Sequence, residues 1–285
     1  MTGRPKQKPL LSLKSWLFTP GTKSDRFARA AEAHADALVI DLEDAVAPSA
    51  KSEARAAAIA YLNTLPEDRL PCALRINSPQ TKVGLDDLQA LLDARAEPDY
   101  LVIPKCDSAG IISLVGNLLT EAEKSTEIIA LIETVEAVAA LEEIASHHPR
   151  PAAFLFGAAD MAADLGAEAA WEPLLFTRSR LIQVGAMAGI VTLDSPYFNL
   201  SDEPGLRQET KAAANLGFHG KCAIHPGQIP TINEVLTPTE QEVEWARRVL
   251  EVNRQGVGSV DHQMVDEAIA RRARRILARV RGRSS

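Results

Sequence analysis

Two short apolar runs with one helical segment between them constrain the fold of this chain most strongly. The first run begins at Ile128 and the second at Ala152, and each ends on a carboxylate, Glu133 in the first and Asp160 in the second. The intervening sequence, VEAVAALEEIASHH, places its apolar side chains on one helical face. A strand, helix and strand in this order put both strands in one parallel sheet with their carboxyl ends on the same side. The sequence therefore predicts two carboxylates at one edge of a sheet.

The same alternation covers most of the chain. Further strands are predicted at residues 15–20, 36–44, 71–77, 100–106, 190–196 and 221–226, and a helical segment follows each of them. Eight such units in about 225 residues match the size of a (β/α)8 barrel better than that of an open doubly wound sheet. The turn after the first strand, FTPGTKSD, has one glycine, which argues against dinucleotide binding. We predict an α/β fold, a (β/α)8 TIM barrel with a C-terminal helical extension.

Changes in composition along the chain predict three parts. Residues 1–13 are polar and mixed and are expected to form a flexible leader, and residues 14–230 are expected to form the barrel. Residues 231–285 are expected to form the helical extension, in which the glycine-containing segment QGVGS separates one well-capped helix from a basic amphipathic helix. A helix held by such a hinge is expected to pack on a neighbouring subunit.

Charge and apolar patterning exclude two classes of partner. The 31 basic and 38 acidic residues give a net charge of −7, which argues against a nucleic-acid partner. No apolar run reaches the roughly 20 residues that span a bilayer, and no secretory signal is apparent, so no membrane partner is expected. The three cysteines, Cys72, Cys106 and Cys222, lack the spacing of a metal site. Reduced thiols of this kind indicate a cytoplasmic protein.

The predicted strand ends gather charged and polar side chains at the end of the barrel where such folds bind ligands. These residues are Asp41, Glu43, Asp44, Arg75, Asn77, Lys105, Glu133, Asp160, Asp194 and His225. Buried charge is costly unless it is paired, so this crowding requires a cation and compensating basic residues. Mg²⁺ takes one or two carboxylates together with waters and substrate oxygens, and Glu133 and Asp160 are its predicted ligands.

Arg75 is the candidate for holding a substrate carboxylate, because its planar guanidinium can donate two parallel hydrogen bonds. The structural alternative is an ion pair of Arg75 with Glu43 or Glu133. Glu43 is a further catalytic candidate, and Asp41 and Glu133 are further substrate-binding candidates. Since one strand cannot point all three of its acids inward, at least one of them is expected to pair with a lysine or arginine of the next helix.

Three other assignments also have alternatives. Each predicted metal ligand could instead cap the following helix or pair with a basic residue. Lys105 could form a Schiff base, although neighbouring acids would keep it protonated. His225 could support the site or be structural.

Several motifs, in this order, resemble the HpcH/HpaI aldolase and citrate lyase superfamily, in its citrate lyase β-subunit-like branch. They are DLEDAV, LIETVEAV, FGAADMAADLG and GKCAIHPGQI, and the resemblance extends from about Ser15 to Asp266. It implies a (β/α)8 barrel with Mg²⁺ held by Glu133 and Asp160, a substrate carboxylate held by Arg75, and carbon–carbon cleavage in a 3-hydroxyacyl thioester. It also implies a homotrimer or hexamer in which the C-terminal segment of one subunit covers a neighbour's site.

The resemblance adds two candidate site residues, and this sequence differs from the family pattern at two places. Asp266 matches an acid/base candidate, and Lys14 stands where many relatives have a substrate-binding arginine. The tail reads DHQMVD, so that His262 and Gln263 replace the glycine and lysine that are common in the family.

The function predicted from the sequence is a Mg²⁺-dependent lyase. It would cleave a malyl-, citramalyl- or citryl-type thioester into a keto acid and an acyl thioester, or catalyse the reverse condensation. The alternatives are a thioesterase on the same metal site, an aldolase that uses a pyruvate enolate without coenzyme A, and the β subunit of a multi-subunit citrate lyase acting on an acyl carrier protein. The sequence leaves open the acyl group, the carrier, the stereochemistry and the direction.

Overall fold

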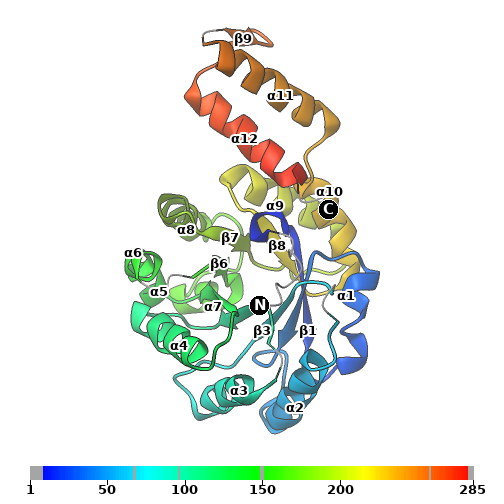
Figure 1. Ribbon diagram of the computed structural model, residues 1–285, viewed down its shortest axis with the longest axis vertical. Helices are drawn as coiled ribbons and strands as arrows, with labels where there is room; N and C mark the ends of the chain where they lie inside the picture. Colours follow the sequence, from blue (N-terminus) through cyan, green and yellow to red (C-terminus); the bar gives the residue numbers. More distant parts are fainter. Residues whose placement is uncertain (1–8, 67–68, 96, 148–150, 257, 282–285) are drawn as a thin grey trace.

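Eight parallel strands close into a barrel in a computed structural model that describes residues 9–66, 69–95, 97–147, 151–256 and 258–281 (Figure 1). Each strand pairs with the next along the chain, and the last pairs with the first. The strands are β1 (Ser15–Pro20), β2 (Ala37–Asp41), β3 (Cys72–Arg75), β4 (Tyr100–Ile103), β5 (Glu127–Ile132), β6 (Ala153–Phe156), β7 (Val191–Asp194) and β8 (Gly220–Ala223). The predicted (β/α)8 architecture is confirmed.

The described residues up to Leu236 contain ten helices, and Figure 1 shows them surrounding the strands. They are α1 (Arg29–Glu32), α2 (Lys51–Leu62), α3 (Lys82–Asp93), α4 (Ala109–Glu121), α5 (Val135–Ala139), α6 (Leu141–Ser146), α7 (Ala158–Leu165), α8 (Leu175–Ala188), α9 (Glu203–Leu216) and α10 (Ile229–Leu236). Local signals fix several ends: Thr81 and Thr134 accept N-cap hydrogen bonds, and Gly166 ends α7 in a left-handed conformation.

Side chains alternate between two cores along every strand, because successive residues point to opposite faces. One set fills the barrel interior and the other packs beneath the helices. Representatives of the interior set are Trp16, Val39, Ala73, Val102, Leu131, Leu155 and Leu193. Counting in steps of two from these residues places Asp41, Arg75 and Glu133 on the inward side, at the carboxyl end of the barrel. The same count places Asp194 on the outward side.

The predicted strands extend too far at their carboxyl ends. β2 ends at Asp41, β3 at Arg75, β4 at Ile103, β6 at Phe156 and β8 at Ala223, so that Asp160 lies in α7 and not at a strand end. Glu43, Asn77, Lys105 and His225 therefore lie in the loops that follow the strands. These loops form the end of the barrel where the site is expected.

The predicted boundary at residue 230 falls inside α10, which follows β8 and packs on β1, β8 and α9. Because α10 is the helix of the eighth unit, the barrel ends at Leu236. At the other end of the chain, residues 1–8 of the predicted leader lie outside the described residues. Leu10–Ser12 form the short 3-10 helix η1, and Leu13 is buried.

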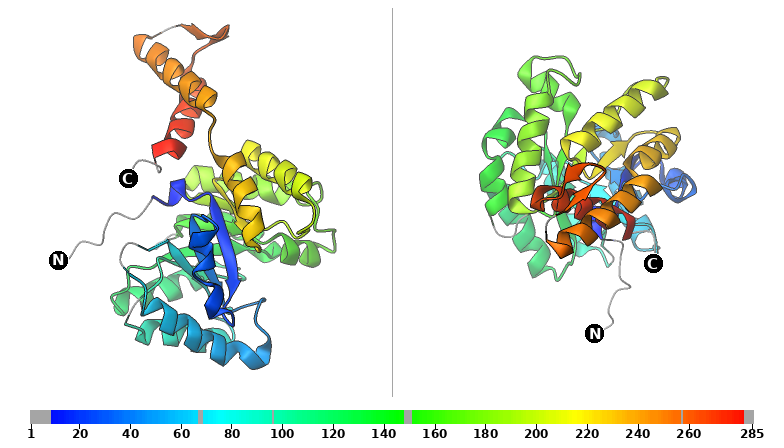
Figure 2. Two further views of the ribbon diagram at one scale, coloured as in Figure 1. Left: turned by 90° about the vertical axis from the view of Figure 1, so that its right-hand side faces the viewer. Right: turned by 90° about the horizontal axis from the view of Figure 1, so that it is seen from above.

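A helical hairpin follows the barrel and projects away from it (Figure 2). It consists of α11 (Glu240–Gln255) and α12 (Glu267–Arg281), joined through the short strands β9 (Ser259–Val260) and β10 (Gln263–Met264). The hairpin has its own small core, and the end of α12 returns to contact η1. Among the described helices, none is long and apolar enough to cross a membrane.

Candidate active site

Asp41 positions Arg75 through the register of two adjacent strands. The two residues are direct partners across β2 and β3. Nε and Nη2 of Arg75 donate to the two carboxylate oxygens of Asp41, both at 2.7 Å. The same oxygens accept the backbone N–H groups of Glu43 and Ala45. Asp41 is buried and its acceptor sites are occupied, so the structure assigns it to positioning Arg75 and not to the predicted direct substrate contact.

The remaining nitrogen of Arg75 faces the loop after β2. Nη1 lies 3.0 Å from Oε2 of Glu43 and 3.6 Å from Oδ2 of Asp44, and the guanidinium lies 5.1 Å from the ring centroid of Phe18. The structural alternative for Arg75, an ion pair with Glu43, is therefore present. Oε2 of Glu43 has no hydrogen-bond partner among the described residues even at this ion-pair distance. Nη1 is the edge of Arg75 that remains suited to a substrate carboxylate.

The basic residues of α2 do not pair with the acids of the β2 loop, which corrects that prediction. Lys51 donates to the backbone carbonyls of Leu42 and Glu43, and Arg55 pairs with Asp87. Arg75 from the neighbouring strand takes their place, because the register brings it to the loop.

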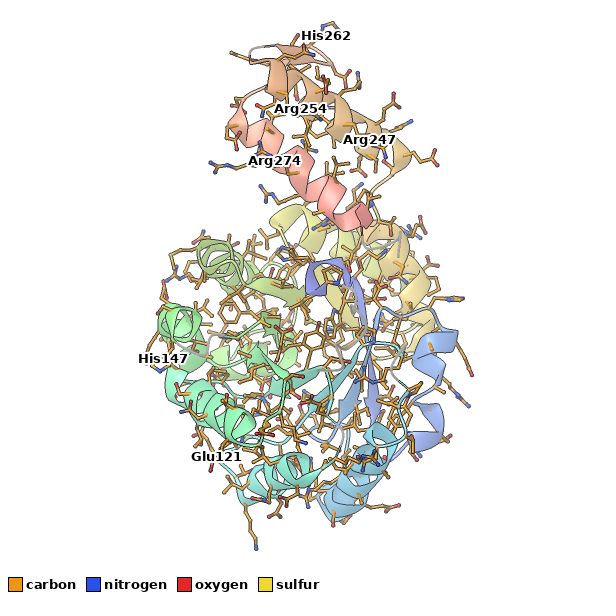
Figure 3. The ribbon with its side chains drawn as sticks, in the orientation of Figure 1. Glu121, His147, Arg247, Arg254, His262 and Arg274 are labelled. Carbon is orange, nitrogen blue, oxygen red and sulfur yellow. The ribbon has the colours of Figure 1, made fainter. Side chains whose placement is uncertain are left out.

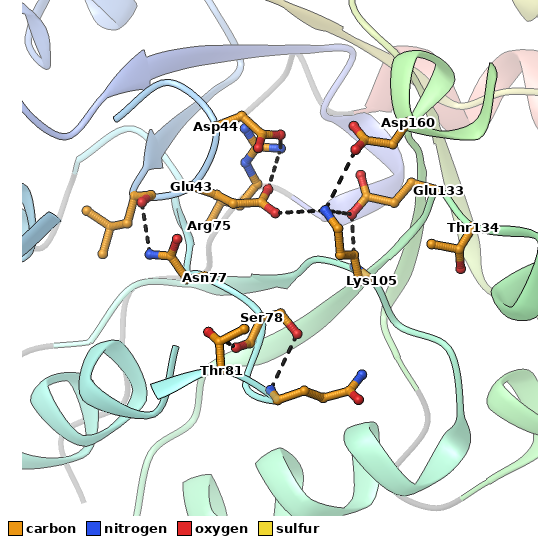
Figure 4. A network of polar contacts seen from close by, with 12 residues as sticks. Glu43, Asp44, Arg75, Asn77, Ser78, Thr81, Lys105, Glu133, Thr134 and Asp160 are labelled. Atoms are coloured by element: carbon orange, nitrogen blue, oxygen red, sulfur yellow. Dashed lines mark hydrogen bonds and ion pairs between the residues drawn. The ribbon is translucent and has the colours of Figure 1, made fainter. Parts of the chain in front are cut away.

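Three carboxylates surround the ammonium group of Lys105 (Figure 4). Nζ lies 3.3 Å from Oε1 of Glu43, 3.7 Å from Oδ1 of Asp160 and 3.8 Å from Oε1 of Glu133. The backbone N–H of Lys105 also donates to Glu133 at 2.8 Å. The loops after β2 and β4, the end of β5 and the first turn of α7 thus converge on one point. The structure brings the two predicted metal ligands together there.

Burial and neighbouring charges raise the pKa of two of these acids, Glu133 and Glu43. Burial, followed by the charges of Glu43 and Asp160, raises the pKa of Glu133 to about 8. Burial also raises the pKa of Glu43, although Arg75 and Lys105 oppose that effect. Carboxyl groups in this state are stabilised by a further cation, so the electrostatics agree with the predicted metal site.

The carboxylate oxygens of Glu133 and Asp160 are donors that suit a small hard cation. No group of three or more His, Cys, Asp or Glu residues in the described parts of the chain forms a complete metal site. Mg²⁺ does not require one, since it is held by one or two carboxylates with waters and substrate oxygens. Gly157 leaves room beside Glu133, because a Cβ there would lie 2.5 Å from Cβ and 2.8 Å from Oε2 of Glu133.

We expect Gly157→Ala to weaken binding of a divalent metal at least tenfold, because the new methyl group must displace Glu133. The φ of Gly157 is −102°, which suits any residue, so the effect comes from the contact with Glu133 and not from backbone strain. Overpacking of this kind costs about 1–3 kcal/mol of stability. Isothermal titration with Mg²⁺ would measure the affinity. Gly110→Ala in α4, where the nearest atom to a Cβ is 3.6 Å away, is the matched control. Equal affinity in both variants would contradict the role of Glu133.

Lys14 is not part of this site, which corrects its predicted role in substrate binding. It precedes β1, at the amino end of the barrel, whereas the site lies at the carboxyl end. Its ammonium group donates to Oγ1 of Thr237 at 2.9 Å. A residue before a strand and one after it are separated by the full height of the barrel.

Asp194 is also absent from the site, because its side chain points outward. It is fully buried and pairs with Lys221 at 2.6 Å and Arg178 at 3.1 Å. Lys221 also pairs with Glu209 of α9 at 2.8 Å. Sequence reasoning missed this buried group of charges, although the alternation along β7 contains the signal.

His225 is exposed and caps a 3-10 helix, η4 (Pro226–Gln228), by accepting the backbone N–H of Gly227 at Nδ1. This contact is the structural alternative for His225. The sequence reasoning missed Gly157, which lies directly beside Glu133. Its signal is a glycine placed directly after a buried strand.

Asp266 directly precedes α12, and its Oδ1 accepts the backbone N–H of Ile269 at 2.9 Å. It lies near β10, at the outer part of the hairpin whose labelled residues in Figure 3 stand away from the barrel. Asp266 is therefore remote from Glu43, Glu133 and Asp160 of its own chain.

Comparison with known proteins places these observations in a family. Residues 14–226 match the model of the HpcH/HpaI aldolase/citrate lyase family. The L-malyl-CoA/beta-methylmalyl-CoA lyase of Cereibacter sphaeroides is 34% identical over 260 residues, which cover 82% of each chain. The citrate lyase subunit beta of Haemophilus influenzae is 32% identical over 283 residues, covering 94% of this chain and 97% of the relative.

Two solved structures are similar over most of the chain. The CitE protein of Mycobacterium tuberculosis, in complex with magnesium, acetoacetate and coenzyme A, has a TM-score of 0.80 and 32% identity, covering 95% of this chain and 99% of that chain. RipC of Yersinia pestis has a TM-score of 0.74 and 43% identity, covering 82% and 100%.

Proposed function

This chain belongs to the HpcH/HpaI aldolase/citrate lyase family, and on that premise we propose a Mg²⁺-dependent carbon–carbon lyase that acts on a coenzyme A thioester. The substrate is a 3-hydroxyacyl thioester of the malyl, citramalyl or citryl type, and the products are a keto acid and an acyl thioester. The convergence of Glu43, Glu133 and Asp160 on one cationic point beside Arg75 is the observation that carries the proposal.

Glu133 and Asp160 would hold Mg²⁺. When bound, the metal supplies a Lewis acid that lowers the pKa of the substrate hydroxyl and polarises the developing carbonyl oxygen. Nη1 of Arg75 binds the substrate carboxylate, while Asp41 fixes the guanidinium plane. Glu43, in its ionised form, lies beside Arg75 and takes the hydroxyl proton as the general base.

Breakage of the C2–C3 bond leaves its electron pair on the thioester fragment as an enolate, which then takes up a proton at carbon. Asp266 is the proposed acid. Because it lies on the projecting hairpin, it would act in the site of a neighbouring subunit. We therefore also propose a homotrimer or hexamer, which light scattering coupled to size-exclusion chromatography would test.

A cytoplasmic location is proposed from the cysteines. Cys72, Cys106 and Cys222 are all free and buried. Reduced thiols are expected in a compartment that keeps cysteines unpaired.

The test is an assay of the purified protein with malyl-, citramalyl- and citryl-coenzyme A, with and without Mg²⁺, that follows both keto acid and free coenzyme A. Keto acid that forms from one thioester only when Mg²⁺ is present would support the lyase. Free coenzyme A without keto acid would identify a thioesterase. Inactivity on all three thioesters would contradict an autonomous lyase of this type and direct the next assay to an acyl carrier protein and partner subunits.

We expect Arg75→Lys to raise KM for the thioester by about 10- to 100-fold, because a hydrogen bond to a charged group contributes about 1.5–3 kcal/mol and lysine lacks the planar fork. Steady-state kinetics would measure the change. Arg69→Lys is the matched control. Arg69 donates two hydrogen bonds to Asp99, which directly precedes β4 at the opposite end of the barrel. Equal KM values in the two variants would contradict the role of Arg75.

Binding of Mg²⁺ is expected to strengthen as the pH rises toward about 8. The pKa of Glu133 is raised to about 8, so below that pH its carboxyl group holds a proton that the metal must displace. The apparent affinity should rise up to tenfold per pH unit and then level off. Titrations of the protein with Mg²⁺ between pH 6 and 9 would measure this. The Glu133→Gln variant should bind weakly at every pH, and a wild-type affinity independent of pH would refute the prediction.

A further inference from the structure

The backbone of Lys105 has an uncommon conformation that points the residue toward Glu133. Its φ is +49°, in the left-handed region that costs a residue with a Cβ atom. In this conformation its N–H donates to Oε1 of Glu133 at 2.8 Å, and its ammonium group lies 3.8 Å from the same oxygen. One residue thus presents two positive groups to one predicted metal ligand.

The contacts of the ammonium group differ in strength. The contact with Glu43, at 3.3 Å, is a hydrogen bond. The contacts with Asp160 and Glu133, at 3.7 and 3.8 Å, are ion pairs beyond hydrogen-bond distance. The weaker contacts are those with the two predicted metal ligands.

The lysine side chain reaches solvent, whereas two of its partners are buried. It is 41% exposed, and the side chains of Glu43 and Glu133 are 9% and 2% exposed. Figure 4 shows the ammonium group between Glu43 on one side and Asp160 with Glu133 on the other. A divalent cation held by Asp160 and Glu133 would meet the ammonium group as a like charge at close range.

We propose that Lys105 is the resident cation of the metal site and that Mg²⁺ exchanges with it. The metal takes Glu133 and Asp160, and the ammonium group remains hydrogen-bonded to Glu43. Without metal, Lys105 neutralises acids that would otherwise repel one another. A monovalent ion has no charge advantage over the ammonium group, so the exchange favours a divalent ion. The inference rests on the proposed function for the identity of the metal.

Replacing Lys105 distinguishes two roles for this residue. If the ammonium group competes with the metal, its removal strengthens metal binding; if it only holds the metal ligands in place, its removal weakens metal binding. Binding of Mn²⁺, as a probe for Mg²⁺, would be measured at pH 8.5 under nitrogen from the electron paramagnetic resonance signal of the free ion. We expect Lys105→Met to bind Mn²⁺ at least tenfold more tightly than the wild type. Lys105→Arg, which keeps the charge, should stay within threefold of the wild type. An equal or weaker affinity in Lys105→Met would overturn the proposal.

A second measurement follows Lys105 itself in the wild-type protein. A limiting amount of an N-hydroxysuccinimide ester would acylate the lysines, and mass spectrometry would compare Lys105 with the exposed Lys211 of α9. We expect Mg²⁺ to raise the relative modification of Lys105 at least threefold in the wild type and not in Glu133→Gln. An unchanged or slower reaction in the wild type would overturn the exchange.

Neither measurement uses a thioester, so the failure of the inference and the failure of the proposed function can be told apart. A protein without lyase activity that still shows both effects supports the exchange alone. A lyase that shows neither effect retains its proposed function and loses the inference.

Discussion

The Asp160→Asn variant is expected to keep its fold and to lose about a thousandfold in kcat/KM for metal-dependent cleavage. A Lewis acid stabilises the transition state by several kcal/mol, and about 4 kcal/mol corresponds to three powers of ten in rate. Asparagine has nearly the same shape as aspartate but carries no charge to hold Mg²⁺. Asp160 is 40% exposed, and its ion pair with Lys105 contributes at most about 1 kcal/mol to stability.

The measurement combines steady-state kinetics with the midpoint of thermal unfolding. Asp164→Asn is the matched control, since Asp164 lies one turn later on α7 and accepts the backbone N–H of Val135 at 2.7 Å, outside the site. We expect that control to retain wild-type kinetics. Undiminished cleavage by Asp160→Asn would remove Asp160 from the metal site, and a comparable loss in both variants would point to damage to α7.

The Asp194→Asn variant is expected to lose about 3–5 kcal/mol of unfolding free energy at pH 7. Removing one partner of a buried ion pair leaves the other charges uncompensated, and here Lys221 and Arg178 would both lose their anion. Burial alone would raise the pKa of Asp194, but the charges of Lys221 and Arg178 outweigh that effect and lower it. Its contribution is therefore present above the unfolded pKa, near 4, and is lost as the pH falls below it.

Urea unfolding at pH 7 and at pH 3 would measure both parts of this prediction. The difference between the variant and the wild type should be large at pH 7 and smaller at pH 3. Glu209→Gln removes the other acid that contacts Lys221, but Glu209 is 18% exposed, so a smaller loss is expected. If Asp194→Asn unfolds at the wild-type urea concentration, the buried group does not stabilise the fold.

The positions of the site residues show what a strand pattern can and cannot predict. Glu133 follows β5 directly, and strand position alone was enough to bring it to the site with Asp160. Asp194 also ends a strand, but one step in the alternation turns it toward the helices. The sequence analysis predicted which acids lie at strand ends but not which face of the strand each one occupies. It therefore grouped Glu133, which faces the site, with Asp194, which faces the helices.

Roles that depend on several loops at once were beyond the sequence. Asp41 was predicted to bind substrate, yet its register partner Arg75 and two backbone N–H groups occupy its oxygens. Lys105 was considered a Schiff-base candidate, and its place among three acids depends on a left-handed backbone that no local pattern signalled. Lys14 was predicted to bind substrate from the family resemblance, but it lies at the amino end of the barrel, away from the site.

The sequence by itself determined the barrel, the order of its strands, the family, and the two converging acids that are the predicted metal ligands. Those features depend on apolar periodicity and on position along single strands, which are local properties. Only the tertiary structure decided which charged groups face the site, because facing depends on strand register and on which loops meet. For the same reason it alone showed that Asp41 positions Arg75 and that the ammonium group of Lys105 lies between Glu43 and the pair of Glu133 and Asp160.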